Sequence, residues 1–250
     1  ANGWENACNG RDEDVAIFTG REMASHFGRG MGNALLSSEP SRASQDVSKR
    51  AERVPDKRRS RFLAARELLA QLMLRVYGIH ELPLLVTNSS GRPGFADPNL
   101  PDVSIAYAGN MVGVLLAEEV GRAGLDMEIV RAHSRQTQDM LTQDLSSGEK
   151  AWINAQQDFM EAVTQIWTLR QSILKLTGEA ESGIGSLQLH PAAGRLRSSV
   201  FPDIQAVCDA EPMLVWSCAL SPGTERLCLW EIDAQQQWQP LRDVEMSKPN

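Results

Sequence analysis

Two acidic side chains lie two residues apart in the segment 124–130, which reads Gly-Leu-Asp-Met-Glu-Ile-Val. On a β-strand, Asp126 and Glu128 project from one face, while the apolar residues between them point to the other. Neighbouring carboxylates repel each other unless a cation or strong hydrogen-bond donors hold them. Such oxygen ligands suit a hard divalent cation, Mg²⁺ above all, especially where phosphate oxygens complete its coordination shell. A half-buried edge strand with two solvated acids is the alternative, and this segment alone leaves both interpretations open.

A second segment that could carry chemistry is 167–178, which reads Trp-Thr-Leu-Arg-Gln-Ser-Ile-Leu-Lys-Leu-Thr-Gly. Its spacing is helical, so Trp167, Gln171 and Lys175 follow one another at four-residue steps along one stripe. A lysine one turn from an amide can neutralise a phosphate as a point charge. An ordinary amphipathic helix is the competing interpretation.

Basic residues are concentrated in one part of a chain that is acidic overall. The 250 residues carry a net charge of −7, which argues against a general nucleic-acid binder. Between residues 49 and 66, eight Lys and Arg residues are opposed only by Glu52 and Asp56. This run is either a solvated helix face or a positive surface for a phosphorylated ligand or an acidic partner. A basic turn follows at 91–95, Gly-Arg-Pro-Gly-Phe, and such turns are common.

The periodicity of apolar residues predicts most of the elements that must position these groups. A helix is expected from Asp56 to Tyr77, ended by Gly78, and two more at 146–155 and 158–177. A short strand is expected near residues 34–36. The other expected strands are 82–87, 103–107, 111–117 and 124–130, followed by a hairpin of 213–220 and 226–232 around Pro222-Gly223.

This order of elements predicts an α+β fold with two related halves, in contrast to a parallel doubly wound sheet. Residues 1–22 lack periodicity and are interpreted as a tail or an expression remnant. We expect an N-terminal half at 23–110 and a C-terminal half at 111–245 that carries the metal and catalytic segments. No apolar run approaches the roughly 20 residues of a membrane span, and no signal peptide is recognisable. A cytoplasmic protein without membrane contact is therefore expected.

Four segments occur together in an order that resembles the 4'-phosphopantetheinyl transferases. They are the helix Arg61-Phe-Leu-Ala-Ala-Arg66-Glu-Leu-Leu, the turn Gly91-Arg92-Pro93, the Gly-x-Asp-x-Glu strand from Gly124 to Glu128, and the helix from Trp167 to Lys175. The family's Asn-x-Ser-His-Ser strand corresponds to Ser104-Ile-Ala-Tyr107-Ala. The resemblance covers residues 56–190; each motif is modest by itself, but the order and spacing are specific.

The resemblance implies two similar α/β halves related by a pseudo-twofold axis, with coenzyme A bound in the cleft between them. The implied reaction is Mg²⁺-dependent transfer of the 4'-phosphopantetheine arm of coenzyme A to a serine of an acyl or peptidyl carrier protein, releasing 3',5'-ADP. It implies a monomer of this length. The implied metal ligands are Asp126, Glu128 and Gln171, which with Lys175 form the catalytic set. The implied coenzyme-binding residues are Arg61, Arg66, Arg92, Ser104, Tyr107 and Lys175.

Two departures from the family pattern bear on this mechanism. The family's phosphate-binding histidine is replaced by Tyr107, whose hydroxyl can donate one hydrogen bond but carries no positive charge. The family's glutamate in Trp-x-x-Lys-Glu, a metal ligand and candidate general base, is replaced by Gln171, and an amide is not a base near neutral pH. Proton removal would then fall to Glu128, Asp126 or a metal-bound water. The alternative function is a catalytically weakened coenzyme A or carrier-protein binding module of the same fold.

Overall fold

The computed structural model describes residues 23–37, 45–118, 120–178, 189–192, 195–198 and 203–246. The expected tail at 1–22 lies outside these residues. The chain divides into two compact units. Unit 1 contains the described residues up to Arg122 together with 223–246, and unit 2 contains the described residues from Ala123 to Pro222.

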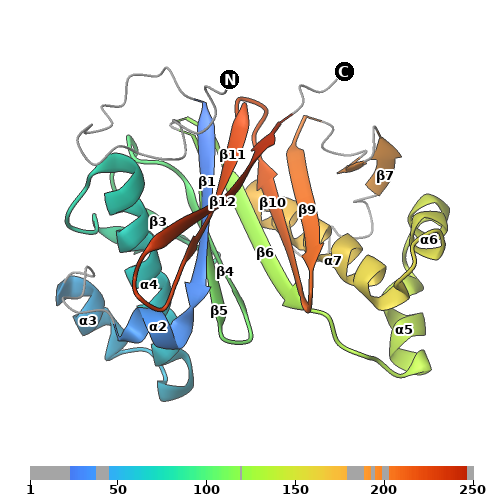
Figure 1. Ribbon diagram of the computed structural model, residues 1–250, viewed down its shortest axis with the longest axis horizontal. Coiled ribbons are helices and arrows are strands. Elements are labelled where there is room, and N and C mark those ends of the chain that lie inside the picture. The colour runs from blue at the N-terminus through green and yellow to red at the C-terminus, as the bar shows by residue number, and fades with distance from the viewer. Residues whose placement is uncertain are drawn as a thin grey trace. The chain divides into compact units, whose positions relative to one another are not determined.

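Unit 1 is built on a five-stranded sheet with the order β12-β11-β1-β5-β4. β1 pairs in parallel with β11 and antiparallel with β5. The long helix α4 packs on this sheet and supplies more of the buried apolar residues of the core than any other element (Figure 1). The elements of unit 1 are β1 (Ala24–Met31), α2 (Gly32–Leu36), α3 (Gln45–Ala51), α4 (Asp56–Tyr77), β2 (Leu85–Thr87), β3 (Pro93–Phe95), β4 (Val103–Ala108), β5 (Met111–Leu116), β11 (Arg226–Ile232) and β12 (Trp238–Glu245).

Unit 2 has a three-stranded antiparallel sheet with the order β6-β10-β9. Helix α7 packs across all three strands, and residues of α5 and α6 join the same hydrophobic cluster (Figure 1). Its elements are β6 (Ala123–Ile129), α5 (Arg135–Thr142), α6 (Ser147–Asn154), α7 (Phe159–Thr177), β7 (Leu189–Ala192), β8 (Arg195–Ser198), β9 (Gln205–Glu211) and β10 (Leu214–Leu220).

The start and end of the helices follow from local chemistry. Ser146 and Glu149 form the expected capping box at the start of α6. The Asp158 side chain accepts a hydrogen bond from the Glu161 backbone and caps α7. Helices α4 and α7 both end at a left-handed glycine, Gly78 and Gly178, where a side chain would be strained. These caps define the start of α6, both ends of α7 and the end of α4.

The α+β class is confirmed, and both units follow the order strand, helices, short hairpin, antiparallel strand pair. The unit boundaries differ from the expected division at 110/111 because β5 pairs with β1 and β4 and therefore belongs to unit 1. The expected hairpin of 213–220 with 226–232 is wrong: β10 pairs with β6 and β9, whereas β11 pairs with β1 and β12. The expected strand at 34–36 is wrong as well, since these residues form α2.

In the part of the chain that the structure describes, no helix is long and apolar enough to cross a membrane.

The core of unit 1 contains a buried histidine. His26 on β1 is buried, and its Nδ1 accepts a hydrogen bond of 3.1 Å from Nε1 of Trp230 on β11. Burial, and secondarily the charge of Arg226, lowers the pKa of His26 from 6.5 to about 4.

This buried ring predicts a pH-dependent free energy of unfolding. The unfolded chain takes up a proton on His26 below its ordinary pKa of 6.5, whereas the folded chain resists protonation down to about 4. We expect about 3 kcal/mol of stability to be lost as the pH falls across this window. Urea unfolding at several pH values tests it, and His26→Gln should remove this part of the pH dependence. An unchanged profile in the variant would contradict the assignment.

Candidate functional site

Strand β6 carries its two carboxylates toward helix α7. Gly124 is the first residue on this face, and a Cβ there would run into the Ser172 carbonyl oxygen and lie 2.7 Å from the Leu176 backbone nitrogen. The absence of a side chain therefore lets α7 approach the strand closely. Because strand residues alternate between faces, Asp126 and Glu128 project to this same side, while Leu125 and Met127 are buried on the other.

This close approach brings Lys175 of α7 to Asp126. The Lys175 ammonium donates to the backbone oxygen of Leu125 at 2.8 Å and to Asp126 Oδ1 at 3.3 Å. The side chains are 36% and 13% exposed, respectively. Burial raises the pKa of Asp126 from 3.8 to about 6, although the charge of Lys175 opposes the shift and Glu128 adds to it. The Oδ2 atom of Asp126 is buried and has no hydrogen-bond partner among the described residues.

The other two members of the predicted catalytic set border this pair. Glu128 is exposed at the end of β6. Gln171 is half-buried on α7, one turn before Lys175 and on the same stripe of the helix. The structure thus brings Asp126 and Lys175 into contact and places Glu128 and Gln171 on the elements that carry them. We call these four residues the β6–α7 group.

Three of the predicted coenzyme-binding residues meet in unit 1, on α4 and β4. The guanidinium of Arg66 is largely buried, lies 3.7 Å above the ring centre of Phe62, and donates to the Phe62 carbonyl at 3.5 Å. It also interacts electrostatically with the Tyr107 hydroxyl. Arg61 lies with its guanidinium 5.6 Å from the Tyr107 ring centre and donates to the Gly109 carbonyl at 3.0 Å. We call Arg61, Arg66 and Tyr107 the α4–β4 group.

The α4–β4 group combines a desolvated cation with a buried hydroxyl. Burial lowers the pKa of Arg66, and the other charges that act on it are Tyr107 and Arg50. Burial likewise raises the pKa of the Tyr107 hydroxyl, which therefore keeps its proton. No carboxylate of the described residues forms an ion pair with Arg66. A desolvated guanidinium of this kind favours an anionic ligand.

The structure does not bring Arg92 and Ser104 into this group. Arg92 donates to Asp102 at 3.0 Å and to the Val103 carbonyl at 3.2 Å, at the start of β4, whereas Tyr107 lies near its end. Ser104 and Tyr107 are three residues apart on β4 and therefore point to opposite faces. Ser104 is buried on the face away from α4.

Comparison with known proteins gives a consistent result. The sequence model of the 4'-phosphopantetheinyl transferase superfamily matches residues 122–210. The protein named "Uncharacterized protein YieE" from Escherichia coli (strain K12) is 47% identical over 230 residues, which cover 89% of this chain and 90% of that protein. The 4'-phosphopantetheinyl transferase AcpT of the same strain is 30% identical over 124 residues, 48% of this chain and 59% of AcpT. The chain belongs to the 4'-phosphopantetheinyl transferase superfamily.

The part of the chain that matches the superfamily model contains the whole β6–α7 group. The α4–β4 group precedes the residues that match this model, so its role stands on its own geometry. No cluster of three or more His, Cys, Asp or Glu side chains that could hold a metal is found within the described ranges. The unpartnered Asp126 Oδ2 is nevertheless an acceptor suited to a cation, and Glu128 and the Gln171 amide are further oxygen donors.

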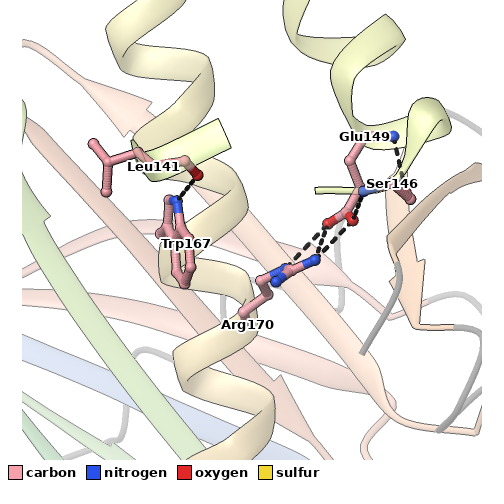
Figure 2. Close-up of polar contacts among 5 residues, drawn as sticks. All are labelled: Leu141, Ser146, Glu149, Trp167 and Arg170. Carbon is pink, nitrogen blue, oxygen red and sulfur yellow. Dashed lines mark hydrogen bonds and ion pairs between the residues drawn. The ribbon is translucent and has the colours of Figure 1, made fainter. Parts of the chain in front are cut away.

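Helix α7 makes a contact with α6 that the sequence did not indicate, at a position of the Trp-x-x-Lys-Glu motif. At its lysine position this chain has Arg170, which is 1% exposed and paired with Glu149, which is 0% exposed. Arg170 donates to Glu149 through Nε at 3.1 Å and through one terminal nitrogen at 2.7 and 2.9 Å (Figure 2). The sequence shows only that Arg170 lies inside a predicted helix and that Glu149, 21 residues earlier, is in a capping position. Neither feature predicts that the two side chains pair.

Proposed function

We propose that this protein transfers the 4'-phosphopantetheine arm of coenzyme A to a serine of an acyl or peptidyl carrier protein, with release of 3',5'-ADP. Membership of the superfamily supports a transferase of this class. The observation that carries the proposal is the contact between Lys175 and Asp126, with a buried carboxylate oxygen left without a partner. A cytoplasmic monomer, as expected from the sequence, is part of the same proposal.

Asp126, Glu128 and Gln171 are the residues that would hold Mg²⁺. When bound, a divalent cation there offsets the negative charge that develops on the leaving phosphate. Burial raises the pKa of Asp126 to about 6, and a bound cation would favour the ionised carboxylate. The ion would supply the partner that Oδ2 lacks in the described chain.

Lys175 provides a positive charge that is already fixed before the substrate arrives. Its two hydrogen bonds to Leu125 and Asp126 hold the ammonium on the side of α7 that faces β6. A preorganised cation stabilises developing phosphate charge without the cost of reorienting water. Glu128, as the exposed carboxylate of the pair, is our candidate for the group that takes the proton from the carrier serine.

The α4–β4 group would bind a phosphate of coenzyme A. Arg66 offers a desolvated planar donor set, and the Tyr107 hydroxyl interacts electrostatically with the same guanidinium. Arg61 adds a second positive charge at the edge of the Tyr107 ring. In this chain the charge that the family places on a histidine would therefore come from Arg66.

The proposal is tested by incubating this protein with coenzyme A, Mg²⁺ and several apo carrier proteins and measuring the intact mass of each carrier. We expect a mass gain equal to one phosphopantetheine arm on at least one carrier. Omission of coenzyme A and chelation of Mg²⁺ with EDTA are the controls. If no carrier gains mass while an established transferase modifies the same carriers, the proposal fails.

A second candidate function is favoured by Gln171 and Tyr107, which replace the family's glutamate and histidine. In this case the protein binds coenzyme A or a carrier protein without efficient turnover. Calorimetry with coenzyme A separates the candidates, because this one retains binding in the absence of carrier modification. A chain outside both candidates would show neither binding nor transfer.

Gln171→Glu measures what this substitution contributes. A carboxylate at position 171 restores both a charged metal ligand and a base, so we expect transfer to be about 10²-fold faster. Gln138→Glu on α5 is the matched control, since its side chain donates to the His133 carbonyl away from the β6–α7 group. Rates are measured from the carrier mass gain with time. Equal rates for wild type and Gln171→Glu would show that position 171 does not limit turnover.

A further inference from the structure

The helix that carries Gln171 and Lys175 is fastened on two opposite sides. On the side of the sheet, the hydroxyls of Ser172 on α7 and Ser217 on β10 are hydrogen-bonded at 2.9 Å. Successive residues of an α-helix are about 100° apart, so Arg170 points about 200° away from Ser172, to the opposite side. There Arg170 meets Glu149 of α6 (Figure 2).

A second contact on this outer side adds to the first. Trp167, one turn before Arg170, donates from Nε1 to the Leu141 carbonyl of α5 at 3.0 Å (Figure 2). The Arg170 guanidinium also lies 5.4 Å from the Trp167 ring centre. We call the contacts of Trp167 with Leu141 and of Arg170 with Glu149 the outer clasp of α7.

Glu149 is itself fixed before it meets Arg170. Its Oε1 accepts a hydrogen bond from the Ser146 backbone at 3.0 Å, and its own backbone donates to the Ser146 hydroxyl at 3.2 Å. The carboxylate therefore has a defined position at the start of α6, and its two oxygens accept the arginine in a multidentate geometry. Such a pair restricts direction as well as distance.

The ion pair of the outer clasp carries a large desolvation cost in free energy. Removing two charges from water costs several kcal/mol per ion, and well-packed apolar residues often stabilise a core as well or better. What the ion pair adds is a single geometry. Because Lys175 lies about 60° around the helix from Ser172, any rotation of α7 moves its ammonium relative to Leu125 and Asp126.

We propose that Arg170 and Glu149 are positioning residues: their ion pair fixes the rotation of α7 and thereby holds Lys175 beside Asp126. The pair does not contact the substrate. In the Trp-x-x-Arg-Gln-x-x-x-Lys segment, Trp167 and Arg170 secure the helix, while Gln171 and Lys175 serve the site. The consequence for catalysis rests on the proposed function, but the placement of Lys175 does not.

The placement is tested by lysine footprinting of the whole protein with an amine-acylating reagent, read by mass spectrometry. Arg170→Lys keeps the charge but loses the planar donor set. Loss of the hydrogen bonds that shield the Lys175 ammonium should raise its acylation rate about 10-fold. Exposed Lys57 on α4 should be unchanged. Arg29→Lys is the matched control, because it alters a buried arginine of unit 1 that pairs with Glu231 at 3.3 Å.

If Arg170→Lys does not fold, the double variant Glu149→Leu with Arg170→Met provides a second test. Replacement of a buried ion pair by apolar residues is often tolerated. Lys175 should be acylated faster in this variant too. Unchanged Lys175 acylation in a folded clasp variant would overturn the proposal, because packing alone would then hold α7.

The activity arm uses carrier modification and a double-mutant cycle. Arg170→Lys should lower kcat about 10-fold with little change in the KM for coenzyme A, as expected for a misplaced group. In a Lys175→Met background, Arg170→Lys should cause no further loss, since both changes act through one side chain. Additive losses would contradict positioning through Lys175. If wild type modifies no carrier, the proposed function fails, and the acylation arm still decides the present inference.

Discussion

Asp126→Asn is expected to lower the rate of phosphopantetheine transfer by about 10³-fold and to make the protein more stable. The rate falls because the variant loses the buried charged oxygen that would bind Mg²⁺ and the partner of Lys175. Stability rises because the native carboxylate is ionised in a desolvated place, as its pKa of about 6 shows. Residues that serve a site commonly reduce stability in this way.

The free energy of unfolding of Asp126→Asn relative to wild type should depend on pH in metal-free buffer. The folded-state pKa of Asp126 lies above its ordinary value of 3.8, so the stabilisation due to its proton is present below 3.8 and lost as the pH rises through 6. Asp126→Asn should therefore gain about 1–3 kcal/mol over wild type above pH 6, and the gain should vanish near pH 4.

Asp139→Asn is the control for the loss of one carboxylate, because Asp139 is exposed on α5. It should change neither the transfer rate nor the pH dependence of urea unfolding. A fast Asp126→Asn enzyme would remove Asp126 from the catalytic set. A variant that is less stable than wild type above pH 6 would show that the contact with Lys175 outweighs the desolvation of the carboxylate.

Local patterns in the sequence were sufficient for the elements that carry the β6–α7 group. Helix α4 begins and ends at the expected residues. β6 differs from its expected range by one residue at each end, and α7 by one residue at its start only. Apolar periodicity and helix caps act within a few residues, so a single segment contains the necessary information. Both carboxylates of β6 face one side because of strand alternation, which the sequence also predicts.

Pairing between distant strands could not be obtained in this way. β1 was not expected, because it contains Gly28 and Gly30 among polar residues and lacks apolar alternation. It is nevertheless the central strand of the unit 1 sheet, and its glycines lie where neighbours approach closely: a Cβ at Gly28 would be 3.2 Å from side-chain atoms of Leu72 and Trp238. The missed β1 also explains the incorrect hairpin, because β11 pairs with β1 in preference to β10.

The candidate site shows the same division between local and distant information. The opposite directions of Ser104 and Tyr107 follow from counting along β4 and were available from the sequence. The partner of Arg170 was not, because nothing local connects an interior arginine of one helix with the capping glutamate of another. Desolvation of Arg66 and Asp126 also depends on tertiary packing, and it separates these two from the exposed charges nearby.

Glu149→Gln is expected to be among the most destabilising single substitutions in unit 2. It preserves the size of the side chain but removes the carboxylate charge that faces the Arg170 guanidinium, which is 1% exposed. Breaking a buried pair from one side typically costs about 3–5 kcal/mol, a large part of the roughly 5–15 kcal/mol that stabilises a domain.

Urea unfolding can show whether the buried arginine charge causes this loss of stability. The proteins compared are wild type, Glu149→Gln and the apolar double variant of Glu149 and Arg170. The double variant should recover most of the stability, because it removes the buried arginine charge together with the carboxylate. Asp56→Asn breaks the exposed pair with Arg59, 2.9 Å long, and should have no measurable effect. If Glu149→Gln were equally harmless, the guanidinium would have to be reached by water or another partner, and the clasp would not constrain α7. The double variant could instead be stable while its Lys175 is acylated faster than in wild type. In that case packing maintains the fold, and the ion pair sets the rotation of α7.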